Sequence, residues 1–115
     1  MATDRFSAGD VFWAPDPYNT GADPRLWLVV AADCLPYAGE EYLCAALTLS
    51  DLPQNIAIGE ADWVVGNHPD KTSYCSPWVV ATIKHDAVVD EQGYVTEAFT
   101  KHIVEESVEY LSGDV

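Results

Sequence analysis

Short apolar segments, each ended by proline, glycine or acidic residues, recur along the first 95 residues of the 115-residue chain. Four of them have the length and side-chain pattern of β-strands, namely residues 9–14, 25–32, 41–49 and 76–83. Residues 9–14 alternate and place Val11 and Trp13 on one face, whereas residues 25–32 are almost continuously apolar, as in a strand buried on both faces. Pro77 stands near the start of its segment, where a strand tolerates proline.

Three further segments give weaker signals. Residues 56–58 and 61–65 predict a short strand pair around Gly59 and Glu60, and residues 90–93 predict a hairpin-like turn. Residues 15–24 contain three prolines and form a ten-residue loop, a length that is more often functional than merely connecting.

A single helix is predicted at about residues 96–111, after the strands. Thr96 is a suitable N-cap, and Gly113 lies just past the end. The apolar residues of this helix form a stripe along one side, consisting of Phe99, Ile103, Val104, Val108 and Leu111. We expect Phe99, Ile103 and Val108 to pack on the strands. The order predicts one domain over residues 1–115, mainly β, with strands within about 9–95: a small, bent antiparallel sheet or barrel capped by a helix.

The charge of the chain is far from balanced. Nineteen Asp and Glu against five Lys and Arg give a formal net charge of −14. The acidic residues are scattered from Asp4 to Asp114, which favours adaptation to a cytoplasm of molar salt, where the Debye length falls to about 3 Å. An acidic nucleic-acid mimic is the alternative, and it predicts carboxylates gathered on one face.

Several classes of protein are disfavoured by the sequence. No apolar run approaches the roughly 18–20 residues of a membrane span, and the first residues lack a signal-peptide pattern. The three cysteines (Cys34, Cys44 and Cys75) are odd in number and lack a C-x-x-C pair, which indicates a reducing cytoplasmic location. Their spacing to the three histidines matches no zinc pattern, so we expect no metal and no cofactor.

Two weak catalytic patterns remain open from the residues alone. Cys75 and His85 are a possible nucleophile and base. The second pattern is a possible cluster of three carboxylates for acid–base catalysis, consisting of Asp16, Asp23 and Asp33. In a chain this acidic, nearby aspartates are expected without any function.

Arg25 and Thr48 are the more informative pair. Arg25 is one of two arginines and stands where the long loop meets the most apolar segment, so its guanidinium needs an anionic or carbonyl partner. That partner is either a carboxylate of the protein, in a plain salt bridge, or the phosphate or carboxylate of a ligand. Thr48 is the one hydroxyl within the apolar run of residues 41–49, apart from Tyr42, although threonine also suits strands without any function.

Four segments in this order resemble the MazF/PemK family of toxins from toxin–antitoxin systems. Residues 9–13 resemble the Gly-Asp opening strand of that family, and residues 25–31 resemble its arginine-led strand after a long loop. Residues 46–50 resemble the strand end that carries threonine, and residues 73–85 with the closing helix resemble the remainder. The chain departs from the pattern where Leu26 replaces a proline, Val79 a glutamine and Lys84-His85 an Asp-Lys pair.

The resemblance implies a small SH3-like barrel with a C-terminal helix, usually a homodimer, that acts as a metal-independent endoribonuclease and is neutralised by a cognate antitoxin. The catalytic pair of the family falls on Arg25 and Thr48. These residue types suit attack by the 2′-hydroxyl of RNA on the adjacent phosphate, because that reaction needs a cation beside the phosphate and a group that orients or relays a proton.

The resemblance also suggests how single-stranded RNA is bound. With few cations available, stacking on aromatic rings replaces part of the usual phosphate neutralisation, and Tyr18 and Tyr74 are the expected platforms. Ser73 is a further candidate substrate-binding residue, and His85 is either an accessory acid or a surface histidine. The alternative function is a non-catalytic barrel of the same fold that binds a partner protein or single-stranded RNA.

Overall fold

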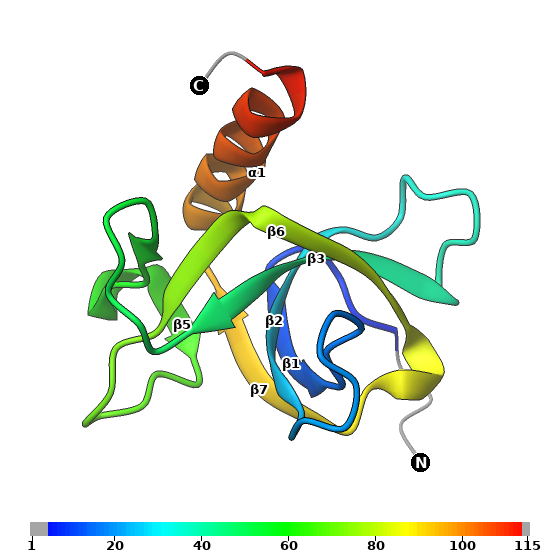
Figure 1. The fold of residues 1–115 in the computed structure, drawn as a ribbon, viewed down its shortest axis with the longest axis horizontal. Coiled ribbons are helices and arrows are strands. Elements are labelled where there is room, and N and C mark those ends of the chain that lie inside the picture. Colours follow the sequence, from blue (N-terminus) through cyan, green and yellow to red (C-terminus); the bar gives the residue numbers. More distant parts are fainter. Residues whose placement is uncertain (1–4, 114–115) are drawn as a thin grey trace.

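The computed structural model describes residues 5–113, and these form one antiparallel sheet of seven strands followed by one helix. The elements are β1 Asp10–Ala14, β2 Arg25–Ala31, β3 Glu41–Thr48, β4 Ile56–Ala57, β5 Trp63–Val65, β6 Tyr74–Lys84, β7 Asp90–Val95 and α1 Glu97–Ser112. The strand order is β4-β6-β3-β2-β1-β7-β5, and the sheet curls into a half-barrel (Figure 1). The predicted class, a small bent antiparallel sheet with a C-terminal helix, is confirmed.

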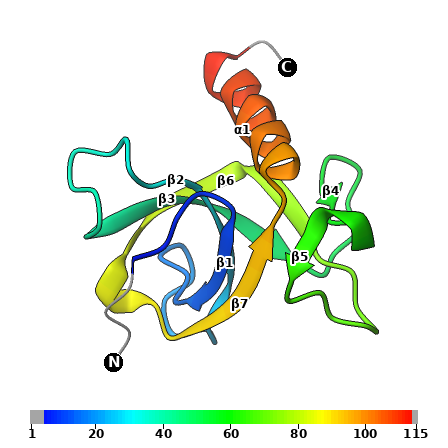
Figure 2. The same ribbon diagram turned by 180° about the vertical axis from the view of Figure 1, so that it is seen from behind.

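Short strands do form near residues 56–58 and 61–65, but their predicted pairing is wrong, and so is the predicted turn at residues 90–93. β4 and β5 do not pair with each other: β4 pairs with β6, β5 pairs with β7, and a 3-10 turn (η1, Glu60–Asp62) lies between them. Both short strands therefore form edges of the sheet (Figure 2). Residues 90–93 are not a turn either, because they belong to the continuous strand β7, which pairs with β1.

Close contact between two glycines explains the course of β7. A Cβ atom on Gly93 would lie 2.0 Å from the carbonyl oxygen of Val65, and one on Gly66 would lie 2.4 Å from that of Gln92. Glycine at position 93 therefore allows β5 and β7 to approach, rather than marking a turn.

The sheet buries apolar side chains on both faces, because neighbouring residues of a strand point in opposite directions. Phe12 and Trp27 belong to one buried cluster, and Val11 and Leu28 belong to a second one. All four are fully buried, and the second cluster includes Ile103 of α1. The apolar run of β2 is thus buried on both sides, as predicted.

The helix begins and ends as the sequence predicts. The Thr96 hydroxyl accepts the backbone N–H of Phe99 at 3.2 Å, and Gly113 ends the helix with a φ of +77°. The predicted packing stripe is only partly right: Phe99 and Ile103 are buried, but Val108 and Leu111 are 55% and 74% exposed. No helix among residues 5–113 is long and apolar enough to cross a lipid bilayer.

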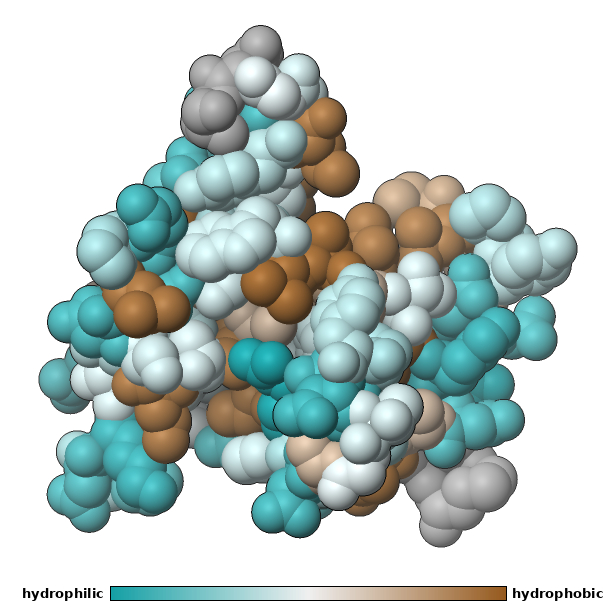
Figure 3. All heavy atoms as spheres, viewed as in Figure 1, coloured by the Kyte–Doolittle hydropathy of each residue, from teal (hydrophilic) through white to brown (hydrophobic). Residues whose placement is uncertain are grey.

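A bulge in β6 supplies a hydrogen-bond partner for Ser107 on the buried face of α1. Ala46 of β3 pairs with Ser76, but Ala45 pairs with Val80, so the residues between them on β6 have no ladder partner. The Pro77 carbonyl in this bulge accepts the Ser107 hydroxyl at 2.7 Å, and both residues are buried. A serine therefore takes the buried position that a purely apolar stripe assigns to Val108. Apolar side chains gather in the angle between α1 and β6 (Figure 3).

Candidate active site

A hollow of about 500 Å³ opens where the start of β2 and the end of β3 lie beside each other. The antiparallel register, which pairs Trp27 with Ala46, brings these two strand ends to the same edge of the structure. The loop of residues 15–24 and the loop of residues 66–73 complete the walls. The hollow lies within the size range of small-molecule and cofactor sites, which span roughly 300–1,000 Å³.

Arg25 enters this hollow from the first position of β2. Its Nη1 lies 3.1 Å from the Asp16 carboxylate, its Nη2 donates to the Leu47 carbonyl at 2.9 Å, and its guanidinium lies 5.6 Å from the ring centre of Trp27. The side chain stays 31% exposed. Its other N–H donors, the buried Nε–H included, have no partner within the described residues. The guanidinium is thus fixed in place while part of it stays free to bind an anion.

Asp16 connects Arg25 to the loop before β2. One carboxylate oxygen accepts from Arg25, and the other accepts the backbone N–H of Tyr18 at 2.8 Å. The Asp16 side chain is only 10% exposed. The salt bridge that the sequence left open for Arg25 therefore exists, and it serves to orient the guanidinium at the wall of the hollow.

Thr48 is the last residue of β3 and lines the same hollow. Its hydroxyl oxygen accepts the backbone N–H of Ser50 at 3.2 Å, which leaves its O–H free to donate. The carbonyl that accepts from Arg25 belongs to Leu47, the preceding residue. A guanidinium and a hydroxyl from neighbouring strands therefore line the same hollow.

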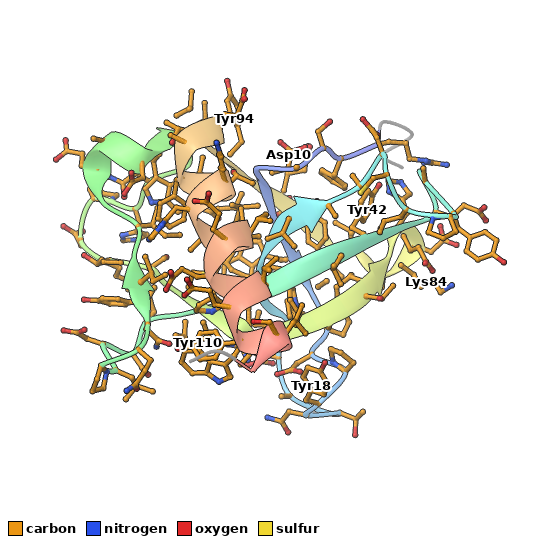
Figure 4. All side chains as sticks on the ribbon, turned by 90° about the horizontal axis from the view of Figure 1, so that it is seen from above. Asp10, Tyr18, Tyr42, Lys84, Tyr94 and Tyr110 are labelled. Carbon is orange, nitrogen blue, oxygen red and sulfur yellow. The ribbon has the colours of Figure 1, made fainter. Side chains whose placement is uncertain are left out.

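The other predicted binding residues divide into two groups. Ser73 lines the hollow with Arg25 and Thr48. Tyr18, Tyr74 and His85 are not among its lining residues. The 65% exposed Tyr18 donates its hydroxyl to the Val80 carbonyl and lies apart from Tyr42 in Figure 4.

Tyr74 and His85 occupy opposite ends of β6 and its flanking turn. Tyr74 pairs with Thr48 and with Ala57 in the sheet. His85 begins the 3-10 turn η2 (His85–Ala87), and its Nδ1 is hydrogen-bonded to the Tyr42 hydroxyl at 2.6 Å. That bond ties the imidazole to the buried aromatic cluster.

The buried cysteines are unsuited to nucleophilic chemistry. Burial raises the pKa of the Cys75 thiol to about 12 and raises the pKa of Cys44 further still. Because the thiolate is the reactive form, neither group attacks a substrate near neutral pH. No group of three His, Cys, Asp or Glu side chains within residues 5–113 is arranged to hold a metal ion.

Gln92, His68 and Lys71 line the hollow but were not predicted from the sequence as site residues. Gln92 of β7 accepts the Trp13 indole N–H at 3.1 Å and donates to the Gly66 carbonyl at 2.8 Å. Lys71 could have been singled out from the sequence, because a lysine in a polar loop is unusual in a chain with five Lys and Arg in total.

The fold is similar to that of two solved endoribonuclease structures from mycobacterial species. One is an endoribonuclease in complex with its cognate antitoxin, with a TM-score of 0.67 and 21% identity over 98% of this chain and 96% of that chain. The other is an endoribonuclease with a TM-score of 0.69 and 19% identity over the same shares. No protein-family model and no curated protein matches the sequence. At the level of the fold, the likeness agrees with the MazF/PemK resemblance.

Proposed function

We propose that this protein is an endoribonuclease toxin of the MazF/PemK type, which cleaves single-stranded RNA with Arg25 and Thr48 and is held in check by an antitoxin. One observation carries the proposal: a partly unsatisfied guanidinium and a hydroxyl line one open hollow, in a fold shared with known endoribonucleases. The MazF/PemK resemblance, which rests in part on the segments that contain Arg25 and Thr48, implies the same two residues as the catalytic pair.

The chemistry needs no nucleophile from the protein. The 2′-oxygen of the substrate forms a bond to the adjacent phosphorus as its proton leaves, and the bond from phosphorus to the 5′-oxygen breaks as that oxygen gains a proton. The products are a 2′,3′-cyclic phosphate and a 5′-hydroxyl. Arg25 stabilises the negative charge that grows on the phosphoryl oxygens, and Thr48 orients the attacking hydroxyl or a phosphate oxygen.

Substitution of the two residues tests this assignment. Removing the Arg25 guanidinium should lower kcat by about 100- to 1,000-fold, since that is the usual effect of deleting one transition-state donor. Arg25→Lys should rescue only part of the rate, because an ammonium ion cannot make bidentate contacts. Thr48→Val, which keeps the shape and removes the hydroxyl, should also lose activity while preserving the circular dichroism spectrum.

Lys84→Ala is the matched control for loss of a positive charge. Lys84 pairs with Glu41 at 3.2 Å at the far end of β6 and does not line the hollow. Lys84→Ala should cleave RNA like the wild type. Cleavage by the wild type should also persist in EDTA, because the proposed reaction uses no metal ion. Unchanged cleavage by Arg25→Ala would reject the proposed active site. RNA binding without any cleavage by the wild type would favour the non-catalytic barrel.

The partners follow from the same proposal. A homodimer and a cognate antitoxin are expected, and the exposed apolar side chains of β6 and α1 offer a surface for either, among them Trp78, Val108 and Leu111. A cytoplasmic location suits both an RNA substrate and three free cysteines.

A further inference from the structure

Lys71 is a positive charge without a partner in a strongly acidic protein. It lines the hollow, and its ammonium makes no hydrogen bond or ion pair within the described part of the chain. Lys84, by contrast, pairs with a carboxylate. With nineteen Asp and Glu available, an unpaired lysine facing a hollow is a site that an anionic ligand can occupy.

His68 lies on the same loop and offers a second donor. Its Nδ1 accepts the backbone N–H of Asp70 at 3.1 Å, so the neutral imidazole carries its hydrogen on Nε2. His68 also lines the hollow. The loop between β5 and β6 thus presents an ammonium and an imidazole N–H, while β2 and β3 present the guanidinium of Arg25 and the hydroxyl of Thr48.

Two separate sets of donors fit a ligand with two anionic groups. In single-stranded RNA the neighbouring phosphates along one strand supply such a pair. Trp13 and Trp63 line the same hollow, and aromatic rings of this kind stack with bases of any sequence. The lining of the hollow therefore includes cations for two phosphates and aromatic rings on which a base can stack.

We propose that Lys71 and His68 form a second phosphate subsite, which binds a phosphate next to the scissile one. This inference rests on the proposed function, because it identifies the substrate as a polynucleotide chain held at two consecutive phosphates. Lys71 adds affinity, whereas Arg25 and Thr48 carry the chemical step.

Binding of a non-cleavable oligonucleotide tests the subsite separately from catalysis. The probe is a fluorescein-labelled, single-stranded 2′-O-methyl RNA of about eight nucleotides and mixed sequence, which lacks the attacking hydroxyl. Its dissociation constant is measured by fluorescence anisotropy from about 0.1 to 1 M KCl. Lys71→Ala should weaken binding about 5-fold at the low-salt end and reduce the log–log salt slope by about 0.7, the value for one single-strand phosphate contact. His68→Ala should also weaken binding, because it removes an N–H donor to the phosphate.

Lys101→Ala is the control, because it removes an equal charge from an exposed position on α1 outside the hollow. It should retain the wild-type affinity and slope. The subsite is wrong if Lys71→Ala binds like the wild type, if Lys101→Ala loses as much, or if the wild type does not bind the probe. Failure of the wild type to cleave natural RNA would instead reject the proposed nuclease and leave the binding result intact.

Discussion

At the scale of single residues, the hollow depends on contacts that support its lining side chains. Gln92 uses both ends of its amide, accepting from Trp13 and donating to Gly66. Asp16 likewise holds Arg25 with one oxygen and the loop backbone with the other. Each of these polar groups fixes a neighbour, so the hollow is shaped before any ligand enters it.

Gly93 gives the sharpest test of this shaping. Alanine there would place its Cβ 2.0 Å from the Val65 carbonyl oxygen, so Gly93→Ala must separate β5 from β7. We expect a loss of about 3 kcal/mol or more in the free energy of unfolding, measured by urea denaturation.

Gly21 provides the comparison for Gly93. It has a φ of +89°, but an added Cβ would meet nothing within 4 Å. Gly21→Ala should therefore cost only about 1–2 kcal/mol, the price of the left-handed backbone. Equal losses in the two variants would mean that the close approach of β5 and β7 is not what fixes residue 93.

At the scale of elements, prediction succeeded where a segment carries its own pattern. β1, β2 and β3 were predicted because their apolar residues match one or two buried faces, and α1 was predicted because Thr96 and Gly113 mark its ends. β4 and β5 were assigned the wrong partners, because each is too short to specify one. Their pairing depends on β6 and β7, which lie further along the chain.

The residues of the hollow that could be predicted likewise lie in segments with their own sequence pattern, and the others do not. Arg25 and Thr48 stand at the ends of segments with clear strand patterns, and the family resemblance implied them as the catalytic pair. Gln92 was hidden because residues 90–93 carry the composition of a turn, and their strand conformation comes from pairing with β1. Lys71 lies in a loop whose position follows from β5 and β6.

The contact between α1 and the sheet leads to a prediction on helix packing. Ile103 is fully buried, whereas Val108 is 55% exposed. Ile103→Ala should lower the free energy of unfolding by about 2–5 kcal/mol, because it leaves a cavity. Val108→Ala should change it by less than about 0.5 kcal/mol. Thermal or urea unfolding of both variants measures these two changes. If the whole apolar stripe of the helix packed on the sheet, Val108→Ala would also lower the free energy of unfolding substantially.

At the scale of the whole molecule, the charge of −14 is spread rather than gathered. Exposed carboxylates occur on loops, 3-10 turns, strand β7 and the helix, for example Asp33, Asp51, Asp86, Glu91 and Glu105. This distribution does not give the single acidic face that a nucleic-acid mimic requires. It is the distribution expected when repulsion is screened by salt.

Salt should therefore stabilise the protein. The free energy of unfolding should be higher at about 2 M KCl than at about 0.1 M, where the Debye length is about 10 Å. A variant with Glu60, Glu91, Glu105 and Glu109 changed to glutamine should depend less on KCl, because fewer charges repel. Equal stability at both salt concentrations would contradict adaptation to high salt.

The two edge strands of the sheet, β4 and β5, follow each other in the chain, and only residues 58–62 separate them. Peptide bonds, and not a hydrogen-bonded seam, thus join the first and last strands of the half-barrel. Each added residue can extend such a bridge by up to about 3.5 Å. Lengthening or trimming this bridge is accordingly a direct means of changing how far apart the two edge strands can lie, with the strands themselves left untouched.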